Sequence, residues 1–359
     1  MARNDALDAA RAVAMVFVVA THAALSFMVT PIGWAVQDRS QHLGVDLYVW
    51  IVRAFAMPTF FWLSGYFSRA VLDSGGWRGY VRHRVVRILI PLVLAVVPCS
   101  LVLGWEWDWG REVVARPGVA DNIPKLQSSE LPLVLGHLWY LYYLLWLSVA
   151  AVALARVARA AQLRIPAGIG VLAVPAVITF GVLAALRSLH TDTPLGFVPD
   201  LPIAIYMGGY FAWGWIVRGR PEELARYGRY AWHALAIAPV FLAVVVATLY
   251  RGLAAIEDAP LYASAASALF AICVMVGFLG LCVRHGRPHR LLRLASESSY
   301  WFYIAHVPIV VALQILVAPI PVPGILKFVA IVIVTSAACM GSYALVSRLN
   351  ARRSIAPQR

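Results

Sequence analysis

Three ionisable side chains interrupt the first apolar stretch of the sequence, residues 8–30, namely Asp8, Arg11 and His22. At ~100° per helical residue all three fall on one helix face, with Arg11 and His22 about 20° apart. At a rise of ~1.5 Å per residue, His22 lies roughly 16 Å from Arg11, or about half the thickness of a bilayer core. An ionisable group at that depth is a functional candidate, and the imidazole of His suits proton transfer near neutral pH.

Further polar residues occur within other apolar segments, namely Arg53, His137 and His306. Counted from the ends of their segments, they lie in the outer half or the centre of the membrane, as His22 does. Structural explanations compete with a functional one, because a His in an apolar helix can simply hydrogen-bond a neighbouring helix. Arg53 can likewise pair with Asp46, seven residues earlier on the same helix face.

A basic cluster, Arg82, Arg84 and Arg87, lies at the start of the third apolar segment. With Arg11 it predicts a cationic mouth on the cytoplasmic side, leading toward the histidines at mid-membrane. The alternative is that these arginines only flank a span on its cytoplasmic side, as positively charged residues commonly do.

The composition identifies a polytopic membrane protein: 62% of the 359 residues are hydrophobic, 13% are charged, and the mean hydropathy is +0.77. Soluble domains contain about 25% charged residues. The net charge of +13 does not indicate nucleic-acid binding, because the Arg residues separate apolar segments and form no basic face of a soluble domain.

The pattern predicts an all-α protein with about ten transmembrane helices in one bundle and both termini in the cytoplasm. Most of the 30 Lys and Arg residues fall in alternate connections, as expected for cytoplasmic loops. The ten expected spans cover residues 8–30, 45–68, 86–104, 131–154, 165–186, 200–217, 231–250, 260–283, 299–318 and 323–347.

The longest outer loop is expected at residues 105–130, where acidic residues exceed basic ones. We expect one transmembrane domain over residues 1–350 and a basic cytoplasmic tail over 351–359. No connection has room for a further domain, so the chemistry is expected within the bundle. The four Cys residues show no metal-ligand spacing, and no metal is expected.

Arg11 and His22 are separated by ten residues, and two further arginines stand in the sequence Arg84-Val85-Val86-Arg87. These two patterns resemble the Arg-x10-His motif of the first helix and the RxxR motif of the integral-membrane acyltransferase type 3 family. Three further segments also match the family's patterns: RAFAMPTFFWLSGYF (53–67), GHLWYLYYLL (136–145) and SYWFYIAHVPIV (299–310). The nearest branch is that of the glucan biosynthesis protein C-like enzymes.

This resemblance implies about ten transmembrane helices, a cytoplasmic acyl-CoA donor and His22 as the catalytic residue. The acceptor would be a hydroxyl of an extracytoplasmic saccharide or a lipid-linked acceptor. The expected location is the bacterial cytoplasmic (inner) membrane, with the lipid bilayer as the surrounding partner. Longer family members carry a periplasmic SGNH hydrolase-like domain that this sequence lacks, so direct delivery to the acceptor is expected.

Acyl transfer from a thioester to a hydroxyl needs a general base, and His22 is the candidate. Asp8 lies more than ~20 Å along the helix from His22, so the group that orients the imidazole must come from another helix. Arg53 or His306 could stabilise the oxyanion. Arg11, Arg84 and Arg87 could bind the CoA phosphates, because guanidinium groups match phosphate oxygens.

An alternative function is a transporter or flippase of a lipid or small anion, with the buried His and Arg residues as a relay. No internal repeat or unwound helix is evident to favour it. A scaffold without activity would leave the deep ionisable residues unexplained.

Overall fold

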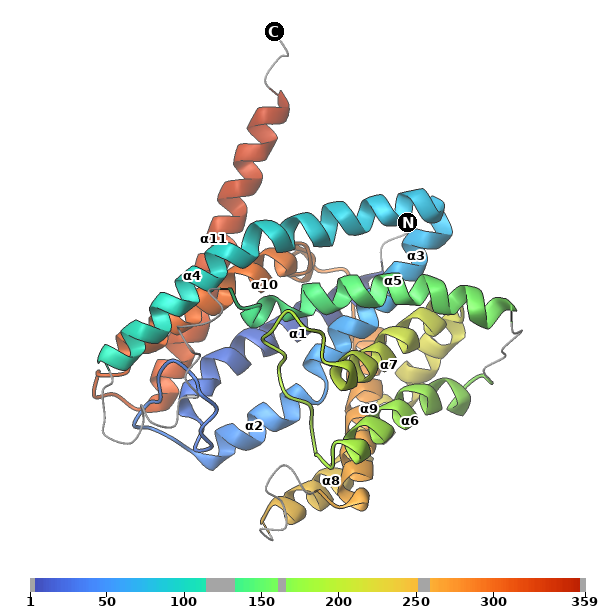
Figure 1. Cartoon of the computed structure of the whole chain (residues 1–359), viewed down its shortest axis with the longest axis horizontal. Coiled ribbons are helices and arrows are strands. Elements are labelled where there is room, and N and C mark those ends of the chain that lie inside the picture. The colour runs from blue at the N-terminus through green and yellow to red at the C-terminus, as the bar shows by residue number, and fades with distance from the viewer. Residues whose placement is uncertain (1–3, 114–132, 161–165, 251–258, 356–359) are drawn as a thin grey trace. The chain divides into compact units, whose positions relative to one another are not determined.

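The computed structural model describes residues 4–113, 133–160, 166–250 and 259–355. In these ranges the chain forms helices and connecting segments, without a strand (Figure 1). The α-helices are α1 (Asp5–Ala24), α2 (Leu43–Arg53), α3 (Ala56–Arg84), α4 (Ile90–Val113), α5 (Trp139–Ala160), α6 (Ile169–Ala185), α7 (Leu201–Arg218), α8 (Pro221–Tyr250), α9 (Leu261–His285), α10 (Arg290–Val317) and α11 (Gly324–Ile355). Two 3-10 turns, η1 (Leu25–Phe27) and η3 (Gly136–Leu138), and one π-helical turn, η2 (Val85–Leu89), complete the order.

Among the described residues, seven helical segments are long and apolar enough to cross a membrane. The protein is therefore a membrane protein, as the composition predicts, and its described part is all-helical. Each of the ten expected spans overlaps at least one helix, whereas the number of crossings and the cytoplasmic position of the termini stay predictions. The expected outer loop at 105–130 and the tail at 351–359 lie partly outside the described residues, which omit 114–132 and 356–359.

The second expected span, residues 45–68, is not one helix. It is broken between Arg53, which ends α2, and Ala56, which begins α3. The cause is Pro58, which lacks the N–H that a continuous helix would donate to the carbonyl of Ala54. Within the first turn of α3, where backbone N–H groups have no helical partner anyway, Pro58 is tolerated.

The connection expected between the second and third spans is helical. α3 continues through residues 69–84 and changes direction at Gly76, whose φ of 58° and ψ of −167° are not helical (Figure 1). Only glycine adopts such a conformation readily. After Gly76, α3 runs to Arg84 and continues through the π-helical turn η2 into α4. α4 extends to Val113, whereas the third expected span ends at residue 104. An ion pair between Asp108 and Arg111 supports this extension.

The sequence predicts one bundle, whereas the residues of the structure group into two compact units. Unit 1 comprises Met1–Ala14, Arg53–Val96 and Val134–His289, and unit 2 comprises Met15–Val52, Val97–Leu133 and Arg290–Arg359. α1 begins in unit 1 and ends in unit 2.

Close packing of α3 and α7 holds unit 1 together. A Cβ at Gly65 would collide with the carbonyl oxygen of Phe211, and one at Gly214 with that of Trp62. Two glycines therefore let the helix backbones meet, which is a common way for helices to associate in membranes. α8 and α9 also lie side by side in this unit (Figure 1).

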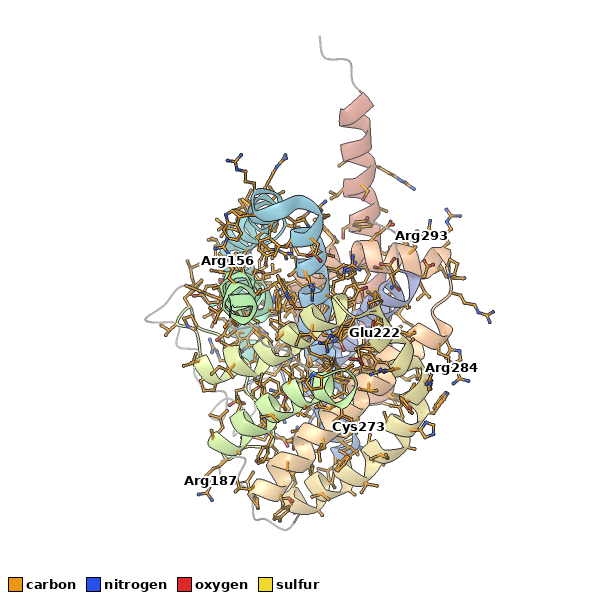
Figure 2. All side chains as sticks on the ribbon, turned by 90° about the vertical axis from the view of Figure 1, so that its right-hand side faces the viewer. Arg156, Arg187, Glu222, Cys273, Arg284 and Arg293 are labelled. Carbon is orange, nitrogen blue, oxygen red and sulfur yellow. The ribbon has the colours of Figure 1, made fainter. Side chains whose placement is uncertain are left out.

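Figure 2 shows Arg187 and Arg284 toward opposite ends of α9, with Cys273 between them. The carbonyl of Arg187 accepts a hydrogen bond from the N–H of Ala259, just before α9, while Arg284 lies in the last turn of that helix. The predicted topology likewise assigns the two ends of α9 to different sides of the membrane.

The core of unit 2 joins the loop after α1 to α4 and α10. Its fully buried apolar residues are Ala35, Val36, Leu103, Val307, Val311, Ile315 and Ala318. A second cluster packs the end of α1 against α10 and α11 through Ala23, Phe27, Val310 and Ile331. The last turn of α1, which carries His22, is thereby held against α10.

Candidate active site

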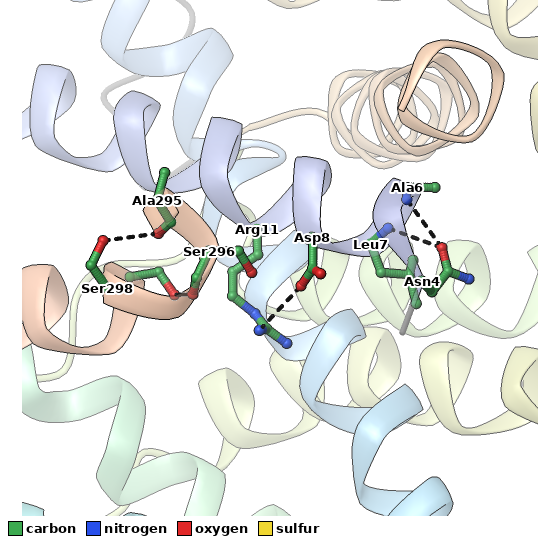
Figure 3. Close-up of polar contacts among 9 residues, drawn as sticks. Asn4, Ala6, Leu7, Asp8, Arg11, Ala295, Ser296 and Ser298 are labelled. Atoms are coloured by element: carbon green, nitrogen blue, oxygen red, sulfur yellow. Dashed lines mark hydrogen bonds and ion pairs between the residues drawn. The ribbon is translucent and has the colours of Figure 1, made fainter. Parts of the chain in front are cut away.

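The start of α1 is fixed by its own polar residues (Figure 3). The Oδ1 of Asn4 accepts hydrogen bonds from the N–H groups of Ala6 and Leu7, as a helix-capping side chain does. Asp8 forms an ion pair with Arg11, one turn away, with Oδ1 and Nη1 3.8 Å apart. The spacing of three residues brings these two charges together on one face of α1.

His22 lies in the last turn of α1, beside His306 of α10. The Nδ1 of His22 is 3.2 Å from the Nε2 of His306 and 2.9 Å from the carbonyl oxygen of Val18. The two imidazole rings meet edge to face, with centroids 4.9 Å apart. Two residues separated by 284 positions, both of them predicted site residues, therefore form one pair within unit 2.

The backbone indicates which nitrogens of this pair carry protons. The Nδ1 of His306 lies 2.8 Å from the carbonyl oxygen of Phe302 and 2.9 Å from that of Tyr303. Because a carbonyl can only accept, this Nδ1 carries a hydrogen, and in a neutral ring Nε2 is then an acceptor. That Nε2 faces the Nδ1 of His22, which by the same reasoning donates to it and to Val18.

It follows that His22 keeps an unprotonated Nε2 that the pair does not use. His306 is completely buried, at 0% exposure, whereas His22 is partly exposed. The buried ring thus orients the accessible one, as the third member of a catalytic triad orients its histidine. The sequence predicted that the orienting partner comes from another helix, but it did not identify His306 in that role.

Gln314, two turns after His306 on α10, bonds the backbone that carries His22. Its Nε2 donates to the carbonyl oxygens of His22 at 2.9 Å and of Ala23 at 3.1 Å. Its Oε1 accepts from the indole Nε1 of Trp34 at 2.7 Å. The ring of Trp34 lies 6.0 Å from that of His22, so the loop after α1 returns to the histidine that α1 carries.

That loop is anchored at several points. A buried ion pair joins Asp38 of the loop to Lys327 of α11, with Oδ2 and Nζ 2.7 Å apart and both side chains at most 3% exposed. The Nε1 of Trp107 donates to the carbonyl of Gly33 at 3.2 Å. The Asp46 carboxylate accepts from the N–H groups of residues 29 and 30 at 2.8 and 2.9 Å.

Arg53 belongs to unit 1, and its guanidinium donates to the carbonyl oxygen of Thr191 at 2.9 Å. The contact with Asp46 that the sequence allowed is not the one observed, since Asp46 binds backbone N–H groups instead. In the adjoining loop, burial and the nearby charge of Arg53 lower the pKa of His190 to about 4, opposed by Asp192. The imidazole of His190 is therefore neutral near pH 7.

The three arginines predicted to bind the CoA phosphates differ in their surroundings. Arg84 is buried at the end of α3, its guanidinium 4.8 Å from the ring centre of Tyr80, whereas Arg87 is exposed within the π-helical turn η2. The guanidinium of Arg11 lies 4.9 Å from the ring centre of Phe67. Arg11 and Arg84 both interact electrostatically with the hydroxyl of Tyr140, so two of the three share one environment in unit 1.

The guanidinium of Arg84 is incompletely bonded. Its Nε and Nη2 are buried without a hydrogen-bond partner among the described residues, and the Nε of Arg218 is in the same state. Buried cationic donors are normally paired, because an unpaired one costs several kcal/mol. These donors therefore suit an anion. In contrast, no group of three or more His, Cys, Asp and Glu residues suited to a metal ion occurs in the described parts of the chain.

Sequence reasoning missed Gln314, Trp34 and Lys327. Gln314 and Lys327 each stood out as a single polar residue in an apolar segment, VALQILV and ILKFVAI. That signal marks them as buried and paired, but it does not identify the partner. Trp34 gave no signal, because it is one of 13 tryptophans in the sequence.

A family model described as an acyltransferase domain matches residues 4–344, which is nearly the whole chain. No curated protein and no solved structure matches the sequence.

Proposed function

The chain belongs to the acyltransferase type 3 family, whose model matches residues 4–344, and on that premise we propose how this membrane acyltransferase works. It transfers an acyl group such as acetyl or succinyl from cytoplasmic acyl-CoA to a hydroxyl of an extracytoplasmic saccharide or lipid-linked acceptor. His22 acts as the general base. We also propose that the enzyme is located in the bacterial inner membrane and belongs to the glucan biosynthesis protein C-like branch.

The observation that carries this proposal is the pairing of His22 with His306. The Nε2 of His22 removes the proton of the acceptor hydroxyl, and the oxygen forms a bond to the thioester carbonyl carbon. When the tetrahedral intermediate collapses, the carbon–sulfur bond breaks and His22 returns the proton to the CoA sulfur. His306 accepts the Nδ1–H of His22 throughout, which fixes the ring and stabilises its cationic form.

This geometry favours a positioning role for His306 over oxyanion stabilisation. Both of its ring nitrogens are already used, Nδ1 by the carbonyls of Phe302 and Tyr303 and Nε2 by His22. A neutral ring in this state has no N–H left for an oxyanion. Arg53 remains the proposed oxyanion donor, because the bond to Thr191 uses only one of its five N–H groups.

The donor's phosphates are proposed to bind Arg11, Arg84 and Arg87. Support comes from the unpaired donors of Arg84 and from the electrostatic interaction of both Arg11 and Arg84 with the hydroxyl of Tyr140. Arg11 and His22 stand on one helix, eleven residues apart, which corresponds to roughly 16 Å. A pantetheine arm of comparable reach would bring the thioester to the imidazole.

The test is acyl transfer by a His22→Ala variant in liposomes supplied with radiolabelled acyl-CoA and membrane glycan extract. Loss of the base is expected to lower the rate by about 10³-fold, within the range for general-base removal. A His233→Ala variant, which alters a histidine on α8 of unit 1, serves as the matched control. Its rate of acyl transfer is expected to equal that of the unmodified enzyme. A His22→Ala enzyme as fast as this control would refute the assignment.

A further inference from the structure

Gln314 contacts the helix turn that carries His22 at the place where that turn lacks backbone partners. The last four carbonyls of an α-helix have no intrahelical donor, and His22 and Ala23 are within the last four residues of α1. In a membrane interior an unsatisfied carbonyl costs several kcal/mol, because water is not there to replace the missing donor. The amide of Gln314 donates to both of these carbonyls, at 2.9 and 3.1 Å.

The other end of the Gln314 amide is also fixed. Its Oε1 accepts from Trp34, and an oxygen in that position directs the NH2 group toward α1. Trp34 in turn is held by the ring of Trp107, with centroids 5.2 Å apart and planes at 73°. Gln314 is 1% exposed, so water does not compete for these bonds.

We propose that Gln314 is a positioning residue for acyl transfer, acting through the backbone of His22, and that Trp34 locks the orientation of its amide. This proposal rests on the proposed function of His22 as the base. His306 fixes the ring of His22, and the Trp34–Gln314 pair fixes its backbone. Both constraints are needed because a reacting group displaced by about 1 Å can lose 10²-fold in rate.

The test compares Gln314→Met with Trp34→Phe. Methionine has a similar length but neither donates to the two carbonyls nor accepts from the indole, whereas Trp34→Phe removes only the indole N–H. Purified enzyme in liposomes is expected to show kcat lower by about 10-fold to 100-fold for Gln314→Met, by less for Trp34→Phe, and an unchanged KM for acyl-CoA in both.

Trp301→Phe is the matched control. It removes an indole hydrogen bond of similar length, 2.9 Å to the Oγ of Ser342, from the same helix as Gln314. A structural effect of losing such a bond would appear equally in this control. We expect its kcat to equal that of the unmodified enzyme.

A second readout does not depend on activity. Diethyl pyrocarbonate labels unprotonated imidazole nitrogens, and mass spectrometry of the peptide containing His22 gives the rate of labelling at that residue. In Gln314→Met the turn is expected to loosen, the contact with His306 to weaken and His22 to label severalfold faster. The Trp301→Phe control is expected to label at the original rate.

These readouts separate the two proposals. If His22 is not the base, His22→Ala stays active while labelling still rises in Gln314→Met. If His22 is the base but Gln314 does not position its backbone, His22→Ala is inactive while Gln314→Met matches Trp301→Phe in both kcat and labelling. The latter result would overturn the positioning role of Gln314.

Discussion

The histidines of unit 2 and the arginines of unit 1 represent opposite ways of burying polar groups. His306 and Gln314 use their nitrogens and oxygens in hydrogen bonds, whereas two donors of Arg84 have no partner in the described chain. A satisfied network keeps its members in one geometry, and an unsatisfied buried cation favours binding of an anion. Under the proposed function, the histidines of unit 2 are preorganised for acyl transfer, and the arginines of unit 1 gain their missing partners when the acyl donor binds.

The largest effect is expected when the orienting imidazole of His306 is removed. His306→Leu is expected to lower kcat by about 10²-fold to 10³-fold without changing KM for acyl-CoA, because His22 loses the partner that fixes its tautomer. His306→Gln, whose amide oxygen can still accept from His22, should recover part of the rate. Steady-state kinetics in liposomes measures both. Equal loss in the two variants would argue against orientation through the Nε2 of His306.

The Asp38–Lys327 ion pair tests whether the loop after α1 depends on its buried anchor. Lys327→Met is expected to destabilise the protein by about 3–5 kcal/mol, because Asp38 is left charged and unpaired in the core. The double variant with Asp38→Leu should regain most of that stability. Thermal unfolding in detergent provides the comparison, and a double variant no more stable than Lys327→Met would contradict this account.

Removing a buried cation from the arginines of unit 1 should not destabilise the protein, in contrast to Lys327→Met. Arg84→Met removes an incompletely bonded buried cation, so the protein without ligand is expected to be as stable as before or slightly more so. Its KM for acyl-CoA is expected to rise by about 10-fold or more, since a charge-assisted contact with phosphate contributes about 1.5–3 kcal/mol. The melting temperature without CoA gives the stability, its shift on adding CoA reports binding, and steady-state kinetics in liposomes gives the KM. Undiminished stabilisation by CoA in Arg84→Met would remove this residue from the donor site.

The smallest expected effect concerns His190. Its pKa of about 4 lies below the usual 6.5 because the folded protein buries the ring beside Arg53. The unfolded chain thus binds a proton first as the pH falls, so the folded state loses stability from about pH 6.5 down to about pH 4. His190→Gln should reduce the fall in melting temperature between pH 7 and pH 5. A fall of the same size in this variant would exclude His190 as a source of it.

The sequence predicts the helical membrane architecture and the most prominent site residue because both leave local signals. Long apolar segments reveal the helices, and His22 is conspicuous at mid-span. Breaks in helices are harder to predict from sequence, although in the structure Pro58 and Gly76 account for the two breaks in residues 45–84. In α4 the charged residues Asp108 and Arg111 read as a loop, but they pair with each other on a helix.

Contacts between residues of different helices could not be predicted, because they depend on which helices pack together. Nothing in one sequence indicates that α1 meets α10, so the roles of His306 and Gln314 toward His22 stayed undetermined. The same holds for Lys327 and Asp38, which are 289 positions apart. Pairing within a helix, such as that of Asp8 with Arg11, could be predicted since spacing alone brings the side chains together.

A double-mutant cycle on His22 and His306 shows whether the two histidines act as a single oriented base. If the two histidines act as one unit, the His22→Ala, His306→Leu double variant transfers acyl groups at the same residual rate as His22→Ala alone, since His306 has no role without its partner. Should the two losses multiply instead, His306 would contribute independently of His22, and the account of one oriented base would be wrong.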